Sequence, residues 1–351
     1  MATKKIPAKK LPVRKIQIKK IQIKKIFVCE FVTAGGFNHV DLPAGLLAEA
    51  TLMRNALLRD LSTLPYEIST TIDARFSAPE YCDHYLTIDA NQNAWDIWAS
   101  QIQLADAVWL IAPETDGLLQ KLTALAVQKG KLILGSGVDA IQITSEKLAT
   151  YYLLQQAGIA TIPTYTDENW PKTAGRWLAK PNDGAGCDGI VIFDDVDNLT
   201  NWLAHNNNRH DNVIQPYQQG IAASISCVMH QGRAQVLSCN MQMIIEQKNG
   251  LSYAGSQVNG MQHFWHAFEL VAQKIAETLA DLNGYVGIDV LVNEQNENQI
   301  TVVEINPRLT TSYAVLADSI ATNPAELIIN TLTQPDFVWP ALKRHVVSVH
   351  V

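Results

Sequence analysis

The sequence predicts a mixed protein of α/β and α+β type, in which a parallel sheet is followed by strand-rich segments. Two observations lead to this fold class. Up to about residue 140, short apolar runs alternate with helical stretches and end in Gly-containing turns, a pattern typical of a parallel sheet. From about residue 176, apolar strands follow one another, and the last two, within 285–307, suggest a hairpin around an Asn/Glu/Gln-rich turn.

The first part of the chain, 26–140, is predicted to form the parallel-sheet domain. A short buried strand at 26–32 precedes a helix at 43–61, with Pro43 near its first turn, where proline is well tolerated. The remaining strands are expected at 66–70, 107–113 and 131–135, with a helix at about 116–129.

The second part of the chain begins with a helix. Its predicted start is the capping sequence Thr144-Ser145-Glu146-Lys147, and Gly158 is predicted to end it. Strands are then expected within 176–193 and 212–220, followed by two strands around a turn at His230 to Arg233. A final helix is expected at about 264–282.

Composition and charge narrow the class of protein. The 351 residues allow two or three domains, and 47% apolar with 17% charged residues is typical of a soluble globular chain. No apolar run approaches the roughly 18 residues of a membrane span. Residues 1–25 hold ten of the 27 Lys/Arg and no Asp/Glu, which leaves 17 basic against 34 acidic side chains in the remainder. So acidic a body argues against nucleic acid as a partner.

The basic N-terminal stretch, residues 1–25, contains the direct repeat IQIKK. It could be a tether to a polyanion or a membrane surface. Charged repeats without aromatic residues rarely pack, so we favour a disordered extension whose last repeat lengthens the first strand.

The five cysteines are widely spaced and form no CxxC pair. An odd number without such spacing indicates neither a disulfide framework nor a zinc site. Reduced, buried thiols in a cytoplasmic protein are the simplest interpretation.

The predicted hairpin carries three oxygen-bearing side chains. Asp289 lies on its first strand, and Glu304 and Asn306 lie two residues apart on its second. Alternate side chains of a strand share a face, so Ile305 would point to the core and the other two away from it. Hard oxygen donors of this kind suit Mg²⁺. From the hairpin alone, a salt-bridge or capping cluster at a sheet edge is an equally good interpretation.

A second motif is AKPNDGAGCDGI, in which Lys180 ends a strand and Gly184, Gly186 and Gly189 follow. Glycines allow a backbone to approach phosphates, and lysine adds a point charge. No GK[ST] sequence follows, so this is not a Walker loop. A glycine-rich hairpin turn of ordinary structural kind remains possible.

A third motif is NVIQPYQQG, an apolar strand that ends in a bend marked by Pro216 and Gly220. Such a segment can offer backbone groups to the edge of an adenine ring. It can also be an ordinary connection between strands.

Together, and in this order along the chain, these elements resemble the ATP-grasp superfamily. The resemblance covers about 26–330 and implies an ATP-grasp fold behind an N-terminal, Rossmann-like pre-ATP-grasp domain. The implied divisions are a tail at 1–25, the N-terminal domain at 26–140, a central subdomain at 141–215 and a C-terminal subdomain with the metal site at 216–351.

The resemblance also implies roles for individual residues. ATP and Mg²⁺ (or Mn²⁺) are the expected cofactors. Phosphate contacts are implied for Lys147 and Lys180, and a flexible loop over the phosphates for the segment around Gly184 and Gly186. Gln215, Pro216 and Tyr217 are implied to form an adenine hinge. Metal ligation is implied for Asp289, Glu304 and Asn306. Arg308 is implied to contact the acyl phosphate or the γ-phosphate. Many members have an acidic residue where Pro216 stands, so the ribose partner is left open.

The activity implied by the superfamily is the joining of a carboxylate to an amine, with release of ADP and phosphate. The segments FVCEFVTAGGF, LIAPETDG and EINPRLTTSY also resemble the family of archaeal tyramine–glutamate ligases of methanofuran biosynthesis and their bacterial relatives. This implies small-molecule substrates, γ-glutamylation of an aromatic amine for a methanofuran- or methylofuran-type cofactor and, as in many related enzymes, a homodimer. The alternatives are another amino-acid or glutamate-adding ligase, or a non-catalytic ATP-binding regulatory protein.

On the same resemblance, Glu30 with Gly35 and Gly36 would border the substrate, and Glu30 would hold an ammonium group. Capping of the following turn is an equal alternative for Glu30. Thr310 and Thr311 would hydrogen-bond the acceptor, although we favour a role for them in capping a helix.

Overall fold

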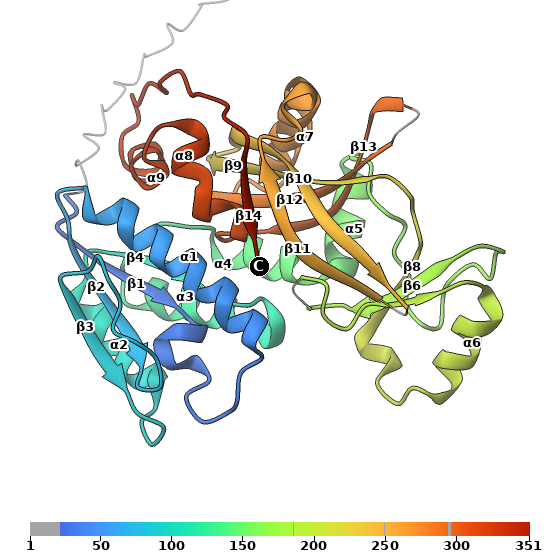
Figure 1. Cartoon of the computed structure of the whole chain (residues 1–351), viewed down its shortest axis with the longest axis horizontal. Helices are drawn as coiled ribbons and strands as arrows, with labels where there is room; N and C mark the ends of the chain where they lie inside the picture. Colours follow the sequence, from blue (N-terminus) through green and yellow to red (C-terminus); the bar gives the residue numbers. More distant parts are fainter. Residues whose placement is uncertain (1–21, 185, 249, 294–295) are drawn as a thin grey trace, which may run out of the picture.

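The computed structural model describes residues 22–184, 186–248, 250–293 and 296–351 (Figure 1). Most of the predicted tail, 1–25, lies outside these residues. Of its last repeat, only Lys25 belongs to the first strand, and the backbone N–H groups of Lys24 and Lys25 donate to Asp106 at 2.9 Å.

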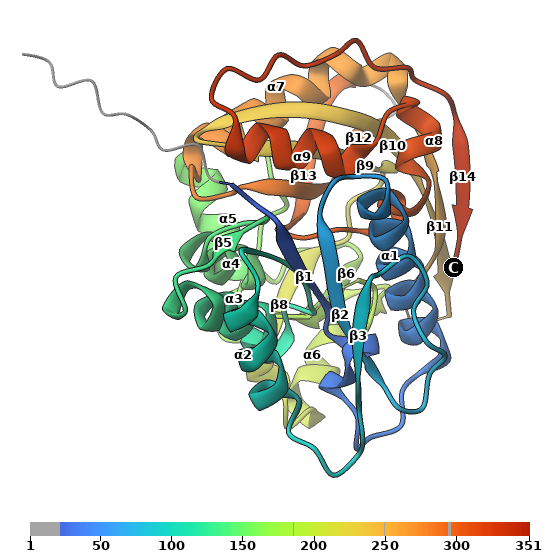
Figure 2. The same ribbon diagram turned by 90° about the vertical axis from the view of Figure 1, so that its left-hand side faces the viewer.

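The N-terminal part forms the predicted parallel sheet, with strand order β3-β2-β1-β4-β5. All four strand pairs in it are parallel. Figure 2 shows the sheet between α1 on one side and α2 and α3 on the other. The bounds are β1 Lys25–Glu30, α1 Ala44–Ser62, β2 Glu67–Asp73, β3 His84–Ile88, α2 Ala94–Leu104, β4 Ala107–Ile111, α3 Leu118–Gln128 and β5 Leu132–Ile133.

The middle of the chain forms a three-stranded antiparallel sheet, in the order β7-β6-β8. It has a small core of its own with α6, which includes Trp177, Phe193 and Leu199. The elements are β6 Trp177–Pro181, β7 Val191–Phe193, α6 Val196–His205 and β8 Asn212–Pro216.

The C-terminal part forms a six-stranded antiparallel sheet in the order β13-β12-β9-β10-β11-β14. The predicted turn between β9 and β10 is confirmed, with positive φ at Gln231 and Gly232. Helix α7 packs on this sheet through Phe268 and Ile275. The bounds are β9 Ile221–His230, β10 Arg233–Gln247, β11 Gly250–Val258, α7 Trp265–Thr278, β12 Gly284–Asn293, β13 Asn296–Asn306 and β14 Val347–His350.

The prediction that Thr144 or Ser145 caps the helix that ends at Gly158 is wrong. Two helices occur here, α4 (Val138–Ser145) and α5 (Lys147–Gln156), and the residue before α5, Glu146, makes no side-chain cap. The hydroxyls of Thr144 and Ser145 donate to carbonyls one turn back in α4. Such back-bonding competes with capping of a following helix. Gly158 ends the segment with φ +67°, as predicted.

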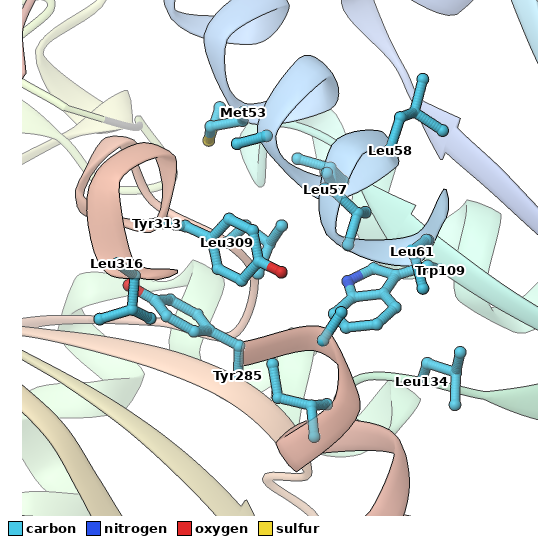
Figure 3. Close-up of a cluster of buried hydrophobic side chains, with 14 of the residues drawn as sticks. Met53, Leu57, Leu58, Leu61, Trp109, Leu134, Tyr285, Leu309, Tyr313 and Leu316 are labelled. Carbon is cyan, nitrogen blue, oxygen red and sulfur yellow. The ribbon is translucent and has the colours of Figure 1, made fainter. Parts of the chain in front are cut away.

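One apolar core joins the N-terminal sheet to the C-terminal part of the chain. In it, Leu57 of α1 shares a cluster with Leu309 and Tyr313, the latter in the short 3₁₀ helix η5 (Thr311–Val315) (Figure 3). The cluster extends into α8 (Leu316–Ile320) and α9 (Pro324–Thr333). The first and last parts of the chain therefore form one packed unit.

This shared core predicts the effect of shortening one of its side chains. Leu57 is fully buried, so Leu57→Ala will destabilise the protein by about 2–5 kcal/mol through lost burial and a cavity. Urea unfolding followed by circular dichroism measures the change. Leu104→Ala is the control because that side chain is 69% exposed, and it should stay within about 0.5 kcal/mol of the parent. Equal effects of the two changes would contradict the assignment of this core.

Candidate active site

The predicted hairpin of β12 and β13 brings its three oxygen-bearing side chains together. Asp289 pairs directly with Glu304 across the strands, and Asn306 pairs with Gly287. Directly opposed side chains of an antiparallel pair lie on the same face. Asn306 Nδ2 donates to Asp289 Oδ2 at 3.1 Å, which leaves the amide oxygen of Asn306 for another partner. Ile305 points the other way, into the core.

The charge of Asp289 is the distinctive feature of this cluster. Burial, together with the nearby Glu304 carboxylate, raises the pKa of Asp289 to about 7. The hydrogen bonds from Asn306 and from Gln242, the latter at 2.8 Å, offset only part of this shift. Two largely desolvated carboxylates side by side are unfavourable unless a cation joins them. Their oxygens and the Asn306 amide oxygen therefore fit a divalent metal such as Mg²⁺.

The cluster relies on only two acidic residues. In the part of the chain that the structure describes, no group of three or more His, Cys, Asp or Glu side chains could hold a metal ion. The magnesium assignment therefore depends on the amide of Asn306 and, as is usual for this ion, on oxygens supplied by substrate phosphates.

The raised pKa of Asp289 predicts pH-dependent metal binding. The folded, metal-free protein keeps a proton on this carboxyl below about pH 7, and a metal ion must displace it. Apparent affinity for Mg²⁺ with ATP should therefore rise between pH 6 and 8, with proton release on binding. Calorimetry in buffers of different ionisation enthalpy measures both quantities. Asp289→Asn should remove the proton release, and a pH-independent affinity in the parent protein would contradict the prediction.

The two predicted phosphate lysines lie beside this cluster. Lys147, the first residue of α5, donates its Nζ to the carbonyl of Gly184, and its Nζ is 3.8 Å from Glu304 Oε1. Lys180, at the end of β6, is buried, and burial lowers its pKa to about 8 although Glu304 opposes the shift. The lysines, the glycine-rich segment and the hairpin thus meet at one place, as the sequence predicts.

The glycine-rich segment turns back over the end of β6. Gly186 and Gly189 have φ of +65° and +74°, and a Cβ at Gly189 would come within 2.8 Å of the ring of Pro181. Only glycine meets both conditions without strain. The turn also contacts the N-terminal domain, since the Asp116 backbone N–H donates to Asp183 Oδ2 at 3.0 Å.

Arg308 is held by Glu114, a residue without a predicted role. Its Nη2 donates to Glu114 Oε2 at 2.8 Å, and both side chains are largely buried. Glu114 follows β4 in the LIAPETDG segment. The second oxygen of Glu114 and the Nε of Arg308 are buried without hydrogen-bond partners among the described residues. In the sequence, the position of Glu114 just after a buried strand was the one local feature that could have indicated a functional role for it.

The predicted adenine hinge has one unsatisfied acceptor. Gln215 is buried and donates its Nε2 to Thr164 Oγ1 at 2.7 Å, while its Oε1 has no partner among the described residues. An exocyclic amino group of an adenine ring would suit such an oxygen. Pro216 ends β8, and the Tyr217 hydroxyl donates to Glu246 at 2.8 Å. The predicted hinge is on the three-stranded sheet, on the strand that pairs with the β6 strand of Lys180.

The predicted substrate residues near the N-terminus lie at the end of the parallel sheet. Glu30 is buried and accepts hydrogen bonds from the Thr33 backbone N–H and hydroxyl, at 2.7 and 2.6 Å, in the turn η1 (Val32–Gly36). These contacts match the capping alternative for this residue. Gly35 has φ +94° and lies against Ile88, and Gly36 donates its N–H to Phe31.

Thr310 and Thr311 do not cap the following helix. The residue before η5 is Thr310, which makes no side-chain cap, so the capping interpretation is wrong. The hydroxyls instead bond two tyrosines: Thr310 with Tyr285 at 2.9 Å, and Thr311 with Tyr253 at 2.7 Å. These tyrosines, on β12 and β11, bond the hydroxyls because a phenol removed from water needs a hydrogen-bond partner.

Comparison with known protein families agrees with this architecture. Residues 66–141 match the pre ATP-grasp 3 domain, and residues 144–312 match the ATP-grasp domain. The second match includes both lysines, the hairpin and Arg308. The chain therefore contains an ATP-grasp domain that follows a pre-ATP-grasp domain.

Two curated relatives are tyramine–L-glutamate ligases. The chain is 28% identical to that of Methanocaldococcus fervens over 321 residues, covering 88% of this chain and 94% of the relative. It is 30% identical to that of Methanocaldococcus jannaschii over 226 residues, covering 64% and 62%. Among solved structures, the biotin carboxylase–β-γ-ATP complex of Campylobacter jejuni has the same fold, with a TM-score of 0.71, 15% identity, and coverage of 92% of this chain and 74% of that one.

Proposed function

We propose that the protein is an ATP-dependent carboxylate–amine ligase that joins glutamate to tyramine or a similar aromatic amine. The terminal phosphoryl group of ATP would pass to a carboxylate oxygen with release of ADP. The amine nitrogen, after losing its ammonium proton to solvent, would then attack the acyl carbon. The C–O bond to phosphate would break, the nitrogen would give up a second proton to the departing phosphate or to solvent, and amide and phosphate would leave. The observation that carries the proposal is the convergence of Lys147, Lys180 and Arg308 on the Asp289–Glu304 pair.

The residues of the site suit phosphoryl transfer rather than acid–base chemistry. Such transfers depend mainly on positioning and on cations that stabilise the charge on the moving group. Lys147 and Lys180 would bind the phosphates, and Arg308 would contact the transferring group. A divalent cation held by Asp289, Glu304 and Asn306 would supply further charge neutralisation. The turn around Gly184 would exclude water, which would otherwise hydrolyse the acyl phosphate.

The substrate assignment is supported by the similarity to the tyramine–L-glutamate ligase of Methanocaldococcus fervens, which extends over 94% of that relative. A tyramine–L-glutamate ligase product belongs with methanofuran- or methylofuran-type cofactors, and we extend that role in one-carbon metabolism to this protein. All five cysteines are free, and three of them are buried, which supports a reducing, cytoplasmic setting. No helix among the described residues has the length and apolar character needed to cross a membrane. A homodimer remains part of the proposal.

The decisive experiment measures ADP release by the purified protein with Mg²⁺ and ATP. Glutamate is supplied with tyramine, with tyrosine and with a wider panel of amines. ADP release only when both carboxylate and amine are present, with a matching amide product, supports the proposal. AMP formation would overturn it, as would the absence of turnover with every pair. Tight ATP binding without turnover would identify a regulatory protein instead.

A further inference from the structure

Helix α1 presents one carboxylate to the active site that the reaction described above does not use. The face of α1 that carries Met53 and Leu57 packs against Leu309 and Tyr313 (Figure 3). Glu49 lies one helical turn before Met53, so it extends the same face beyond the apolar core. Leu309 follows Arg308 directly, and this face of α1 therefore reaches the position of Arg308.

The surroundings of Glu49 are defined by three parts of the site. Its carboxylate interacts electrostatically with Arg308, with Asp188 of the glycine-rich segment and with Tyr253 of β11. Burial, opposed by Arg308, raises the pKa of Glu49. Glu49 thus lies near residues of three parts of the chain: the segment after β13, the glycine-rich turn and β11.

Glu49 has no strong partner of its own. Among the described residues it takes part in no hydrogen bond or ion pair, although it is half-buried. The nearest cation, Arg308, is bound at 2.8 Å by Glu114. A second carboxylate beside an already paired guanidinium is a surplus negative charge. A partly desolvated charge of this kind is unfavourable until a cation approaches it.

The proposed reactants contain one kind of group that fits this charge. ATP and the acyl phosphate are anions and would be repelled by Glu49. An amine substrate and the α-amino group of glutamate both carry an ammonium group at neutral pH. Each could donate charge-assisted hydrogen bonds to a carboxylate.

We propose that Glu49 is a substrate-binding residue that pairs with a primary ammonium group of a substrate. The inference rests on the proposed ligase function and assigns a part of the site to the positive end of a reactant. The ammonium belongs either to the acceptor amine or to the glutamate donor, and the experiment separates these two sources.

The test compares Glu49→Gln with the parent enzyme by ADP release, varying one substrate at a time. Glutamine keeps the shape and removes the charge. We expect the KM of one ammonium-bearing substrate to rise about 10-fold or more, as when one partner of a buried charge pair is lost, and the KM of ATP to stay within twofold. A rise for tyramine assigns the ammonium to the acceptor, and a rise for glutamate assigns it to the donor.

Two uncharged analogues make the measurement specific for the ammonium group. Tyrosol replaces the amino group of tyramine by a hydroxyl, and glutarate lacks the α-amino group of glutamate. For the substrate that Glu49 holds, the inhibition constant of the uncharged analogue in the parent enzyme should be about 10-fold or more above the KM of the ammonium-bearing substrate. Glu49→Gln should remove that difference. Glu49→Asp, which keeps the charge, should retain part of it.

Glu80→Gln is the matched control, because Glu80 is an exposed carboxylate of the same domain and should leave every KM unchanged. Thermal shifts measured with each substrate and a non-hydrolysable ATP analogue repeat the comparison without turnover. If Glu49→Gln does not fold, Glu49→Asp takes its place in this comparison. Unchanged KM and thermal shift for both substrates in Glu49→Gln would overturn the proposal. Failure of the parent enzyme to turn over any pair would instead refute the ligase function.

Discussion

Glu304→Gln will reduce ADP release by at least about 100-fold, a loss on the order of 3 kcal/mol of transition-state stabilisation, and added Mg²⁺ will not restore it. Glu304 is opposite Asp289 in the hairpin and within 3.8 Å of the Lys147 ammonium. Glutamine keeps the volume but removes the charge that would bind a metal. Initial rates across a range of Mg²⁺ concentrations measure the effect.

The fold of this variant should remain intact, because removing one of two neighbouring carboxylates relieves repulsion with Asp289. Circular dichroism and the melting temperature check this. Glu277→Gln serves as the control, since that side chain is exposed on α7, and it should keep the parent rate. A Glu304→Gln enzyme with the parent dependence on Mg²⁺ would remove Glu304 from the metal site.

Arg308→Met will affect both activity and stability. Loss of a cation at the transferring group should lower kcat by about 10³-fold, the lower end of the range for an arginine acting on a phosphoryl group. It also leaves Glu114 buried without its partner, which should destabilise the protein by about 3–5 kcal/mol. ADP release and urea unfolding measure the two effects separately.

The double variant Arg308→Met with Glu114→Gln separates catalysis from structure. Neutralising Glu114 removes the unpaired buried charge, so most of the stability should return while activity stays low. Recovery of activity along with stability would show that Arg308 only supports the fold.

The sequence was most informative where local pattern and local geometry coincide. In the parallel sheet, β1 and β4 have continuous apolar runs and are buried along nearly all their length. The β12–β13 hairpin places Asp289 opposite Glu304 because the alternation of a strand and the position of one turn determine which side chains meet. These two features were sufficient to predict the middle of the parallel sheet and the carboxylate pair.

Elements with weak patterns were not predicted. Strand β3 is exposed at four of its five residues, so it shows no apolar run. Strand β11 is rich in Gly and Ser, and β14 has only four residues and pairs with β11 across nearly a hundred positions of sequence. Each becomes a strand because a neighbouring strand offers unpaired backbone groups, which the local sequence does not reveal.

The contacts of the site that depend on packing between distant segments were also missed. Glu114 meets Arg308 across 194 positions, and Glu49 reaches the same region only because α1 packs on the segment after Arg308. Nothing in the spacing of either glutamate indicates such a contact. The misassigned capping roles of Thr310 and Thr311 have a similar cause, since distant tyrosines bind their hydroxyls.

The distribution of the apolar cores has a consequence for motion. Because the parallel sheet shares a core with the C-terminal segments, separating these two parts would expose a large apolar surface. The three-stranded sheet has an independent core, so it can rotate as a rigid body at little energetic expense. On the proposed function, nucleotide entry and product departure should therefore move this small sheet, while the remainder acts as a fixed base.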